Sequence, residues 1–372
     1  MTVGKPVLTS RRHAASADSE EVQALFERMG YNDGLPIVSP TEERVLRMLG
    51  GADWDPAREI GSIAPRQGLA TVEKVAVNAV MAGCLPEQMP ILLAGVRAIA
   101  EPGLNLFAAE SSTGPYATLM VVNGPVRHAA RINCGSNALG VGARANAAIG
   151  RALRLVIINV GGSVSGKTNM GTLGQSAMFT CCVGENEEAS PWEPLHVERG
   201  HTQDVSTVTC INLRGMYDTF SSSRDAREIA RVIAGGMTPL GSGNVYYGGE
   251  PGVLICPERA KTLAAGGYIK LSLKQELFER ARVPFGLIPK PEQELLLGLR
   301  GDMFPEWKPD TMVPVARRPE DIFLVVTGGV GAHSMHLMTQ GESSKSQTVV
   351  ITREDGTPLR IPAVSQPTPP PA

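Results

Sequence analysis

Residues 153–171 read LRLVIINVGGSVSGKTNMG. The apolar run LVIINV at 155–160 is typical of a buried strand, and the segment GGSVSGKT at 161–168 matches the phosphate-loop pattern G-x-x-x-x-G-K-[ST]. In a working phosphate loop the backbone N–H groups surround the phosphates, Lys167 reaches the terminal ones and Thr168 binds Mg²⁺. The stretch therefore predicts a strand, and it raises a nucleotide-binding protein as one functional alternative.

The residues after this loop give it little support. A phosphate loop needs a helix directly after it and a later strand that ends in an acidic residue. Here the loop is followed by Gly171 and Gly174, and each glycine costs a helix about 1 kcal/mol relative to alanine. The only acidic strand end, Glu258, follows a proline. The chain contains 41 glycines, so a chance match is more frequent, and a solvent-facing glycine turn is the favoured interpretation.

The composition describes a globular chain of 372 residues with 42% hydrophobic and 19% charged residues. A net charge of -2 argues against a nucleic-acid partner, because no basic excess is present to neutralise a phosphate backbone. Without a run of about 18 apolar residues or a signal-peptide pattern, the sequence predicts no membrane association and a cytoplasmic location. None of the six cysteines forms a C-x-x-C pair, so they are expected to be reduced thiols.

Strand and helix patterns alternate along the chain, which predicts an α/β fold with mixed sheets covered by helices in two subdomains. Helices are expected at 18–30 with Asp18 as the cap, 39–50 with Ser39 as the cap, 71–83 with Thr71 as the cap, 84–103, 143–154, 223–236, 257–267 and 271–283. Strands are expected at 105–110, 117–126, 155–160, 205–213, 252–258, 320–327 and 348–355. The predicted organisation is a mobile tail (1–17), an N-terminal α/β domain with the site (18–201), a C-terminal α/β domain (202–361) and a proline-rich tail (362–372).

The segment INCGSNALGVG at 132–142 contains a cysteine, Cys134, flanked by glycine and serine. A thiol in such a turn can act as a nucleophile if backbone N–H groups or a cation lower its pKa. A small buried residue in a tight turn is the alternative.

The segment at 181–201, CCVGENEEASPWEPLHVERGH, concentrates carboxylates and histidines between prolines. Glu187 and His196 suit a general acid–base pair, and Glu185 and Asn186 suit substrate contacts. The same side chains could instead supply metal ligands, but His196 and His201 are five residues apart, not the four of a helical zinc site. No metal ligand is therefore assigned, and the sequence leaves open whether a metal is bound. A charged surface loop is the alternative.

The segment VVTGGVGAHSM at 325–335 joins a predicted strand to a glycine cluster. Gly328, Gly329 and Gly331 would let backbone amides approach an anion, with His333 and Ser334 placed to touch it. A simple turn fits the same residues equally well.

Five blocks of the sequence together resemble the UGSC (seleno)protein group, bacterial proteins named for a selenocysteine or cysteine motif. The resemblance covers about residues 21–340 and rests on the blocks YNDGLPIVSPTEERVLRML, TVEKVAVNAVMAGCLPEQMPILLAGVRAI, INCGSNALGVGARANAAIGRALRLVIINVGG, GENEEASPWEPLHVERG and VLICPERAKTLAAGGY. It implies thiol-type redox chemistry, and it implies that the family's site includes the residues matching Asn146, Gly150, Arg151, Glu185, Asn186, Glu187 and His196.

Two departures from the family pattern affect what can be carried over. Where members resemble P-E-H-A, this chain has Pro257-Glu258-Arg259-Ala260, so the role of that histidine does not transfer. Asn137 stands where the second cysteine of the UGSC motif would be, which leaves Cys134 without an adjacent resolving thiol. Members need no lysine in the stretch matching 165–168, which supports a chance origin of the phosphate-loop match.

The resulting hypothesis is a cytoplasmic enzyme that acts on a small molecule by thiol-dependent redox chemistry or cleavage of a carbon–heteroatom bond. Cys134 would be the nucleophile, His196 the acid–base group and Glu187 its orienting carboxylate. Asn146 and Arg151, five residues apart on one expected helix, would bind an anionic or amide-bearing substrate. The alternatives are a nucleotide-binding protein that uses residues 161–168 and a non-catalytic subunit of a larger enzyme. The sequence identifies no cofactor, and it leaves open a homo-oligomer or a partner subunit.

Overall fold

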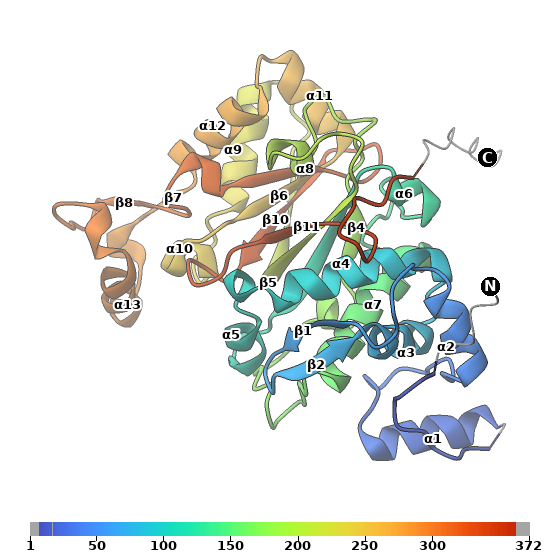
Figure 1. The fold of residues 1–372 in the computed structure, drawn as a ribbon. Coiled ribbons are helices and arrows are strands. Elements are labelled where there is room, and N and C mark those ends of the chain that lie inside the picture. Colours follow the sequence, from blue (N-terminus) through green and yellow to red (C-terminus); the bar gives the residue numbers. More distant parts are fainter. Residues whose placement is uncertain (1–6, 17, 362–372) are drawn as a thin grey trace.

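In the computed structural model, which describes residues 7–16 and 18–361, seven strands form one mixed sheet in the order β4-β3-β5-β10-β6-β9, with β11 paired to β5 (Figure 1). The strands are β3 (Ala117–Asn123), β4 (Cys182–Gly184), β5 (Thr207–Phe220), β6 (Gly252–Ile255), β9 (Phe323–Val326), β10 (His333–Thr339) and β11 (Gln347–Val350). Helices pack against this sheet, so the predicted α/β fold class is confirmed.

The two halves of the sheet are connected in the same way. β3 and β4 are parallel and β5 is antiparallel to β3, while β6 and β9 are parallel and β10 is antiparallel to β6. β5 and β10 pair in the middle of the sheet, so each half is a β-α-β-β unit related to the other by an approximate twofold rotation. Because β3 and β4 precede residue 201 and β5 follows it, the boundary expected there runs through one sheet.

The helices form two layers with separate cores. One core joins α2 (Glu42–Leu49), α3 (Val72–Ala82), α4 (Met89–Ala100) and α7 (Arg144–Asn159) to β3, β5 and β11, and the other joins α9 (Ala226–Gly236), α11 (Pro257–Ala265) and α12 (Lys270–Arg280) to β6 and β9. The remaining helices are α1 (Ser19–Met29), α5 (Leu106–Ser111), α6 (Val126–Ala129), α8 (Leu195–Glu198), α10 (Gly243–Tyr247) and α13 (Lys290–Arg300), with short 3-10 turns at Pro86–Gln88, Pro102–Leu104, Ser176–Met178, Phe285–Leu287, Gly301–Met303 and Pro319–Asp321.

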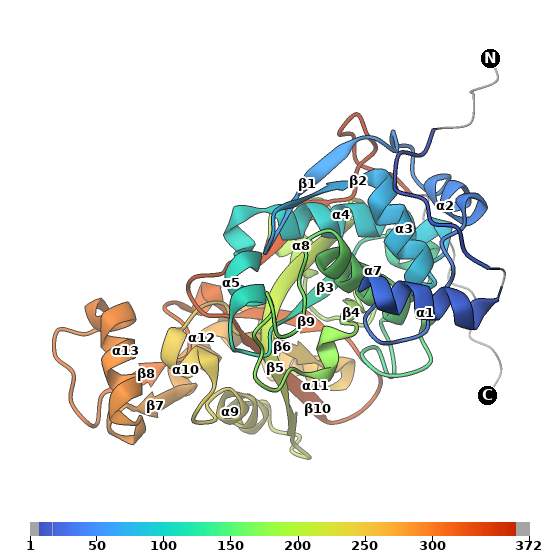
Figure 2. The ribbon, with the colours of Figure 1, turned by 90° about the horizontal axis from the view of Figure 1, so that it is seen from below.

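Two small hairpins lie outside the main sheet. β1 (Glu59–Ile63) pairs with β2 (Gly68–Thr71), and β7 (Arg282–Pro284) pairs with β8 (Met312–Pro314). Figure 2 shows α13 with β7 and β8 at one end of the molecule and α1, α2 and α3 at the other. Among the described residues no single helix is long and apolar enough to cross a membrane. The helix pair Pro86–Ala100 and Pro102–Ser111, bent by 69° between its two parts, has the length and apolar composition of a membrane span only when the two parts are taken together.

The strand expected at 155–160 is wrong, because LVIINV continues the preceding helix as the last turns of α7. α7 packs between α3 and the strands β3 and β4, and ten of its residues are buried. A helix buried on several sides carries a continuous apolar run, which periodicity alone does not distinguish from a buried strand.

Other element predictions are confirmed or corrected by their caps. Asp18 caps α1 and Thr71 caps α3, as predicted, but α2 is capped by Thr41 and not by Ser39. The strand expected at 105–110 is the helix α5, because the Asn105 side chain accepts the N–H of Ala108 and starts a helical turn.

Part of the expected N-terminal tail is anchored to α3. The buried carboxylate of Glu73 accepts hydrogen bonds from the backbone N–H groups of Thr9 and Ser10, both at 2.8 Å, and from the Thr9 hydroxyl at 3.0 Å. These bonds hold residues 8–16 against the helical layer as a strap. Residues 1–6 and 17 and the proline-rich tail expected at 362–372 lie outside the described residues.

Candidate functional site

Three segments meet where β4 and β9 end. The N–H of Asn186 donates to the carbonyl of Val326 at 2.7 Å, which joins the segment after β4 to the end of β9. The carbonyl of Cys134 accepts the N–H of Gly328 at 2.9 Å, which brings in the 132–142 loop. β4 and β9 are the two edges of a sheet that curls into a half-barrel, and these bonds hold the predicted cysteine loop, the acidic segment and the glycine cluster together.

Arg127, on α6, lies at the centre of this meeting point. Its guanidinium is buried, and its Nη1 lies 3.7 Å from the sulfur of Cys134 and 2.6 Å from the carbonyl oxygen of Glu185. Its Nη2 pairs with Glu187 and Glu188, each at 2.9 Å. A buried arginine whose charge is balanced by two carboxylates therefore lies next to the thiol.

The Cys134 side chain is half-buried, as is Cys256, whereas the other four cysteines are buried. Burial raises the pKa of the Cys134 thiol, and the charge and hydrogen bond of Arg127 oppose this without reversing it. A Cβ atom on residue 184 would lie 2.4 Å from the Cys134 sulfur, so the glycine at that position leaves the space that the sulfur occupies. The thiol is thus half-buried and stays protonated at neutral pH.

Glu187 and His196 lie together, as their assignment as a pair requires, but both are buried. Glu187 accepts the N–H of Gly124 at 2.7 Å and the side-chain amide of Asn123 at 3.0 Å, and its Oε1 is 3.9 Å from Nδ1 of His196. His196 has a relative exposure of 0%, and burial lowers the pKa of its imidazole. Because the His196 imidazole has no exposed surface, it is not placed to exchange a proton with a substrate at Cys134.

A second histidine, His128, lies at the surface of the same cluster. Its Nε2 is 3.0 Å from Oε1 of Glu188, and the two side chains are 28% and 41% exposed. Burial acts to raise the pKa of Glu188, but the hydrogen bond and charge of Arg127 outweigh it and lower this pKa to about 2. Sequence reasoning missed Arg127 and His128, although both follow closely after β3, where the end of a strand is a frequent place for functional side chains.

Asn146 is buried and supports the cysteine loop. Its Oδ1 accepts the N–H of Asn133 at 2.8 Å, and its Nδ2 donates to the carbonyls of Asn133 and Ala138 at 2.9 and 3.0 Å. Arg151 forms an ion pair with Asp33 at 2.8 Å, on the side of α7 that faces the N-terminal segment. The structure therefore does not bring these two residues together as substrate-binding groups.

Glu185 is buried as well, and burial raises the pKa of its carboxyl despite the charge of Lys270. It accepts the side-chain amide of Asn123 at 2.6 Å and the N–H of Leu195 at 2.8 Å. Its position links β3 to α8, which carries His196. The backbone N–H of Asn186 also bonds to Val326. Glu185 and Asn186 therefore hold β3, β9 and α8 together around the site, instead of contacting a substrate as predicted.

The glycine cluster after β9 divides into two parts. A Cβ atom on Gly329 would lie 2.0 Å from the Ser136 hydroxyl, so this residue packs directly on the cysteine loop. His333 and Ser334 instead begin β10, where His333 lies 3.0 Å from the carboxylate of Asp218 and the carbonyl of Ser334 accepts the Thr219 hydroxyl. Only the first part of the cluster belongs to the site around Cys134.

The phosphate-loop match at 161–168 follows a helix, not a strand, and no helix of four or more residues starts within the loop or directly after it. The carbonyl of Val164 accepts the N–H groups of Lys167, Thr168 and Asn169 at 3.0, 2.9 and 3.0 Å. The Thr168 hydroxyl accepts the N–H of Val164 at 2.7 Å and donates to Gly162. The amides and hydroxyl that would bind phosphate and metal thus bind within the loop.

Replacing Lys167 by alanine is expected to change the free energy of unfolding by less than about 0.5 kcal/mol, because the side chain is exposed. Since the loop amides are already bonded, MgATP is expected to give no Lys167-dependent rise in the melting temperature. Differential scanning fluorimetry of both proteins with and without MgATP measures this. A rise in the wild type that the variant loses would contradict the expectation.

Among the residues that the structure describes, no three His, Cys, Asp or Glu side chains are arranged to hold a metal ion. The site instead offers a thiol, a buried guanidinium and an exposed histidine–carboxylate pair, which together can carry out nucleophilic attack with proton transfer. The chain matches no protein-family model, no curated protein and no solved structure.

Proposed function

We propose that this protein is an enzyme that acts on a small molecule through the thiol of Cys134, by thiol redox chemistry or cleavage of a carbon–heteroatom bond. The observation that carries the proposal is the contact between the half-buried Cys134 sulfur and Nη1 of Arg127, at 3.7 Å. The same nitrogen lies 3.1 Å from Oε2 of the exposed Glu188. A substrate at this surface would meet the sulfur and the carboxylate together. The resemblance to the UGSC group supports the same chemistry.

In this proposal the thiolate forms only as the substrate reacts, because burial keeps the resting thiol protonated. Arg127 stabilises the developing negative charge on sulfur. His128, held by Glu188, is the partly exposed group that takes up the proton, in place of the buried His196. Glu187 positions Arg127 and the end of β3, and His196 lies beside Glu187. The near-neutral charge of the chain favours a small molecule over a nucleic acid as the substrate.

Replacing Glu188 by glutamine is expected to speed the alkylation of Cys134 at a fixed pH. The negative charge of Glu188 raises the pKa of Cys134, while the positive charge of Arg127 lowers it, so removing the carboxylate lets Arg127 favour the thiolate. Peptide mass spectrometry after timed iodoacetamide treatment between pH 7 and 10 gives the rate for each cysteine. We expect the midpoint of the Cys134 rate profile to shift to lower pH.

The matched control is Glu20→Gln, which removes an exposed carboxylate on α1, away from the site. It is expected to leave the Cys134 profile unchanged, and Cys256 serves as an internal reference in each sample. An unchanged Cys134 rate in Glu188→Gln would remove the electrostatic basis of the proposal. The enzymatic claim itself is tested by turnover of small disulfides and thioesters, which Cys134→Ser must abolish.

A further inference from the structure

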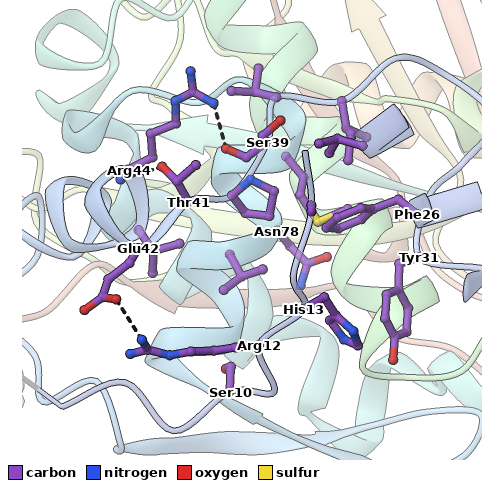
Figure 3. Close-up of a pocket in the computed structure, with 18 of the residues that line it drawn as sticks. Ser10, Arg12, His13, Phe26, Tyr31, Ser39, Thr41, Glu42, Arg44 and Asn78 are labelled. Atoms are coloured by element: carbon purple, nitrogen blue, oxygen red, sulfur yellow. Dashed lines mark hydrogen bonds and ion pairs between the residues drawn. The ribbon is translucent and has the colours of Figure 1, made fainter. Parts of the chain in front are cut away.

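A cavity of about 930 Å³ lies at the other end of α7 from the cysteine loop, between the strap at 8–16 and helices α1, α2 and α3 (Figure 3). Ligand pockets commonly have volumes of this order, and packing defects in protein interiors are much smaller. None of the residues around Cys134 lines this cavity. It is therefore a separate candidate binding site.

The wall formed by the helices is mainly apolar. Val22 and Phe26 of α1, Val45 of α2, and Val77 and Met81 of α3 line it. These side chains offer a surface that suits the hydrocarbon part of a ligand. The wall is continuous with the core under α3, so its shape is fixed by packed helices and not by loops alone.

The rim formed by the strap and by α2 and α3 carries an excess of positive charge. Arg11, Arg12, Arg44 and Lys74 line the cavity, together with the carboxylates Glu42 and Glu73. Arg12 pairs with Glu42 at 2.9 Å. The side chains of Arg44 and Lys74 donate to the neutral carbonyls of Ser39 and Leu69.

Three of these cations, Arg11, Arg44 and Lys74, have no carboxylate within ion-pair distance among the described residues. The carboxylate of Glu73 does not neutralise them, since its hydrogen bonds go to the strap backbone. Charge left uncompensated at the mouth of an apolar cavity favours an anionic group at that position.

The polar groups deeper in the cavity are partly unsatisfied. Nδ2 of Asn159 donates to the carbonyl of Tyr31 and to Asn78, but its buried Oδ1 has no hydrogen-bond partner among the described residues. Figure 3 shows the rings of His13 and Tyr31 side by side at the rim, with centroids 6.3 Å apart.

We propose that this cavity binds an amphipathic carboxylate, with its hydrocarbon chain against the apolar helical wall. Its carboxylate lies at Arg11 and Lys74, two of the rim cations that have no carboxylate within ion-pair distance among the described residues. The strap covers the bound ligand. Glu73 holds the strap against α3 by accepting the backbone N–H groups of Thr9 and Ser10. The proposal is independent of the chemistry at Cys134, since the two sites share no residue.

Isothermal titration calorimetry of the full chain with decanoate, below its micelle concentration, tests the site. We expect saturable binding of one equivalent, and much weaker binding of decylammonium, which has the same chain and the opposite charge. Replacing both Arg11 and Lys74 by glutamine is expected to raise the Kd for decanoate about tenfold, because two charge-assisted contacts are lost. Both side chains are exposed, so the variant is expected to fold.

Two further variants complete the test. Arg224→Gln combined with Arg227→Gln removes the same charge from exposed positions near α9, outside the cavity, and is expected to leave the Kd unchanged. Val77→Phe fills the cavity from α3 and is expected to abolish binding. The proposal is overturned if decanoate fails to bind, or if it binds the Arg11/Lys74 and Val77 variants as tightly as the wild type.

Discussion

Replacing Arg127 by methionine is expected to destabilise the protein by about 3–5 kcal/mol, the usual cost of breaking a buried ion pair by removing one partner. The guanidinium is 2% exposed and satisfies Glu187, Glu188 and the carbonyl of Glu185. Methionine fills most of the volume but offers no donor to Oε2 of Glu187 and the buried carbonyl oxygen of Glu185. Denaturant unfolding at pH 7 measures the loss.

Two variants separate this effect from a general loss of packing. Arg131→Met removes an exposed arginine just after α6 and is expected to change stability by less than about 0.5 kcal/mol. Adding Glu187→Gln to Arg127→Met removes the buried charge that lost its partner, so the double variant is expected to regain part of the stability. If Arg127→Met unfolds at the wild-type denaturant concentration, the guanidinium is not the centre of the site.

Stability is expected to fall by about 3 kcal/mol as the pH falls from 6.5 to 4, because of one buried histidine, His336 on β10. Burial lowers the pKa of its imidazole to about 4, from an ordinary value of 6.5. The unfolded chain therefore binds the proton more tightly across this window. The stability is complete above pH 6.5 and is lost as the pH falls through the folded pKa.

About 2 kcal/mol of this loss falls between pH 7 and 5, where most carboxylates remain ionised. Comparing the wild type with His336→Gln by urea unfolding at several pH values over this range isolates the contribution. Glutamine keeps a polar side chain but does not titrate, so the difference in unfolding free energy between the two proteins is expected to change by this amount. If the unfolding free energies of the two proteins change in parallel with pH, the imidazole of His336 is not excluded from water.

The sequence predicted the elements whose signals are local. Asp18 and Gly30 delimit α1, and Thr71 starts α3, because caps satisfy backbone groups within a few residues. The strands β3, β6 and β9 were found from short β-branched runs between turns. Residues 155–160 were assigned to a strand because a helix buried on several sides has no polar face to reveal its period.

The candidate site could be predicted in part. Cys134, Glu187 and His196 do lie in neighbouring parts of the structure, and Gly329 packs on the cysteine loop. Their roles could not be assigned from the sequence, because burial decides them. His196 is enclosed, while His128 is exposed and lies beside Glu188. The central arginine, Arg127, has no motif around it, since its importance comes from carboxylates about 60 residues away in the chain.

The sequence by itself determined the α/β class, most of the helix ends and the presence of a cysteine loop and an acidic segment. These follow from residue propensities, caps and patterns that act over a few positions. Only the tertiary structure decided that β4 and β9 end at one place, that Arg127 lies between Cys134 and Glu188, and that a cavity separates the strap from α3. These features depend on strand order and burial, which arise from contacts between residues distant in the chain.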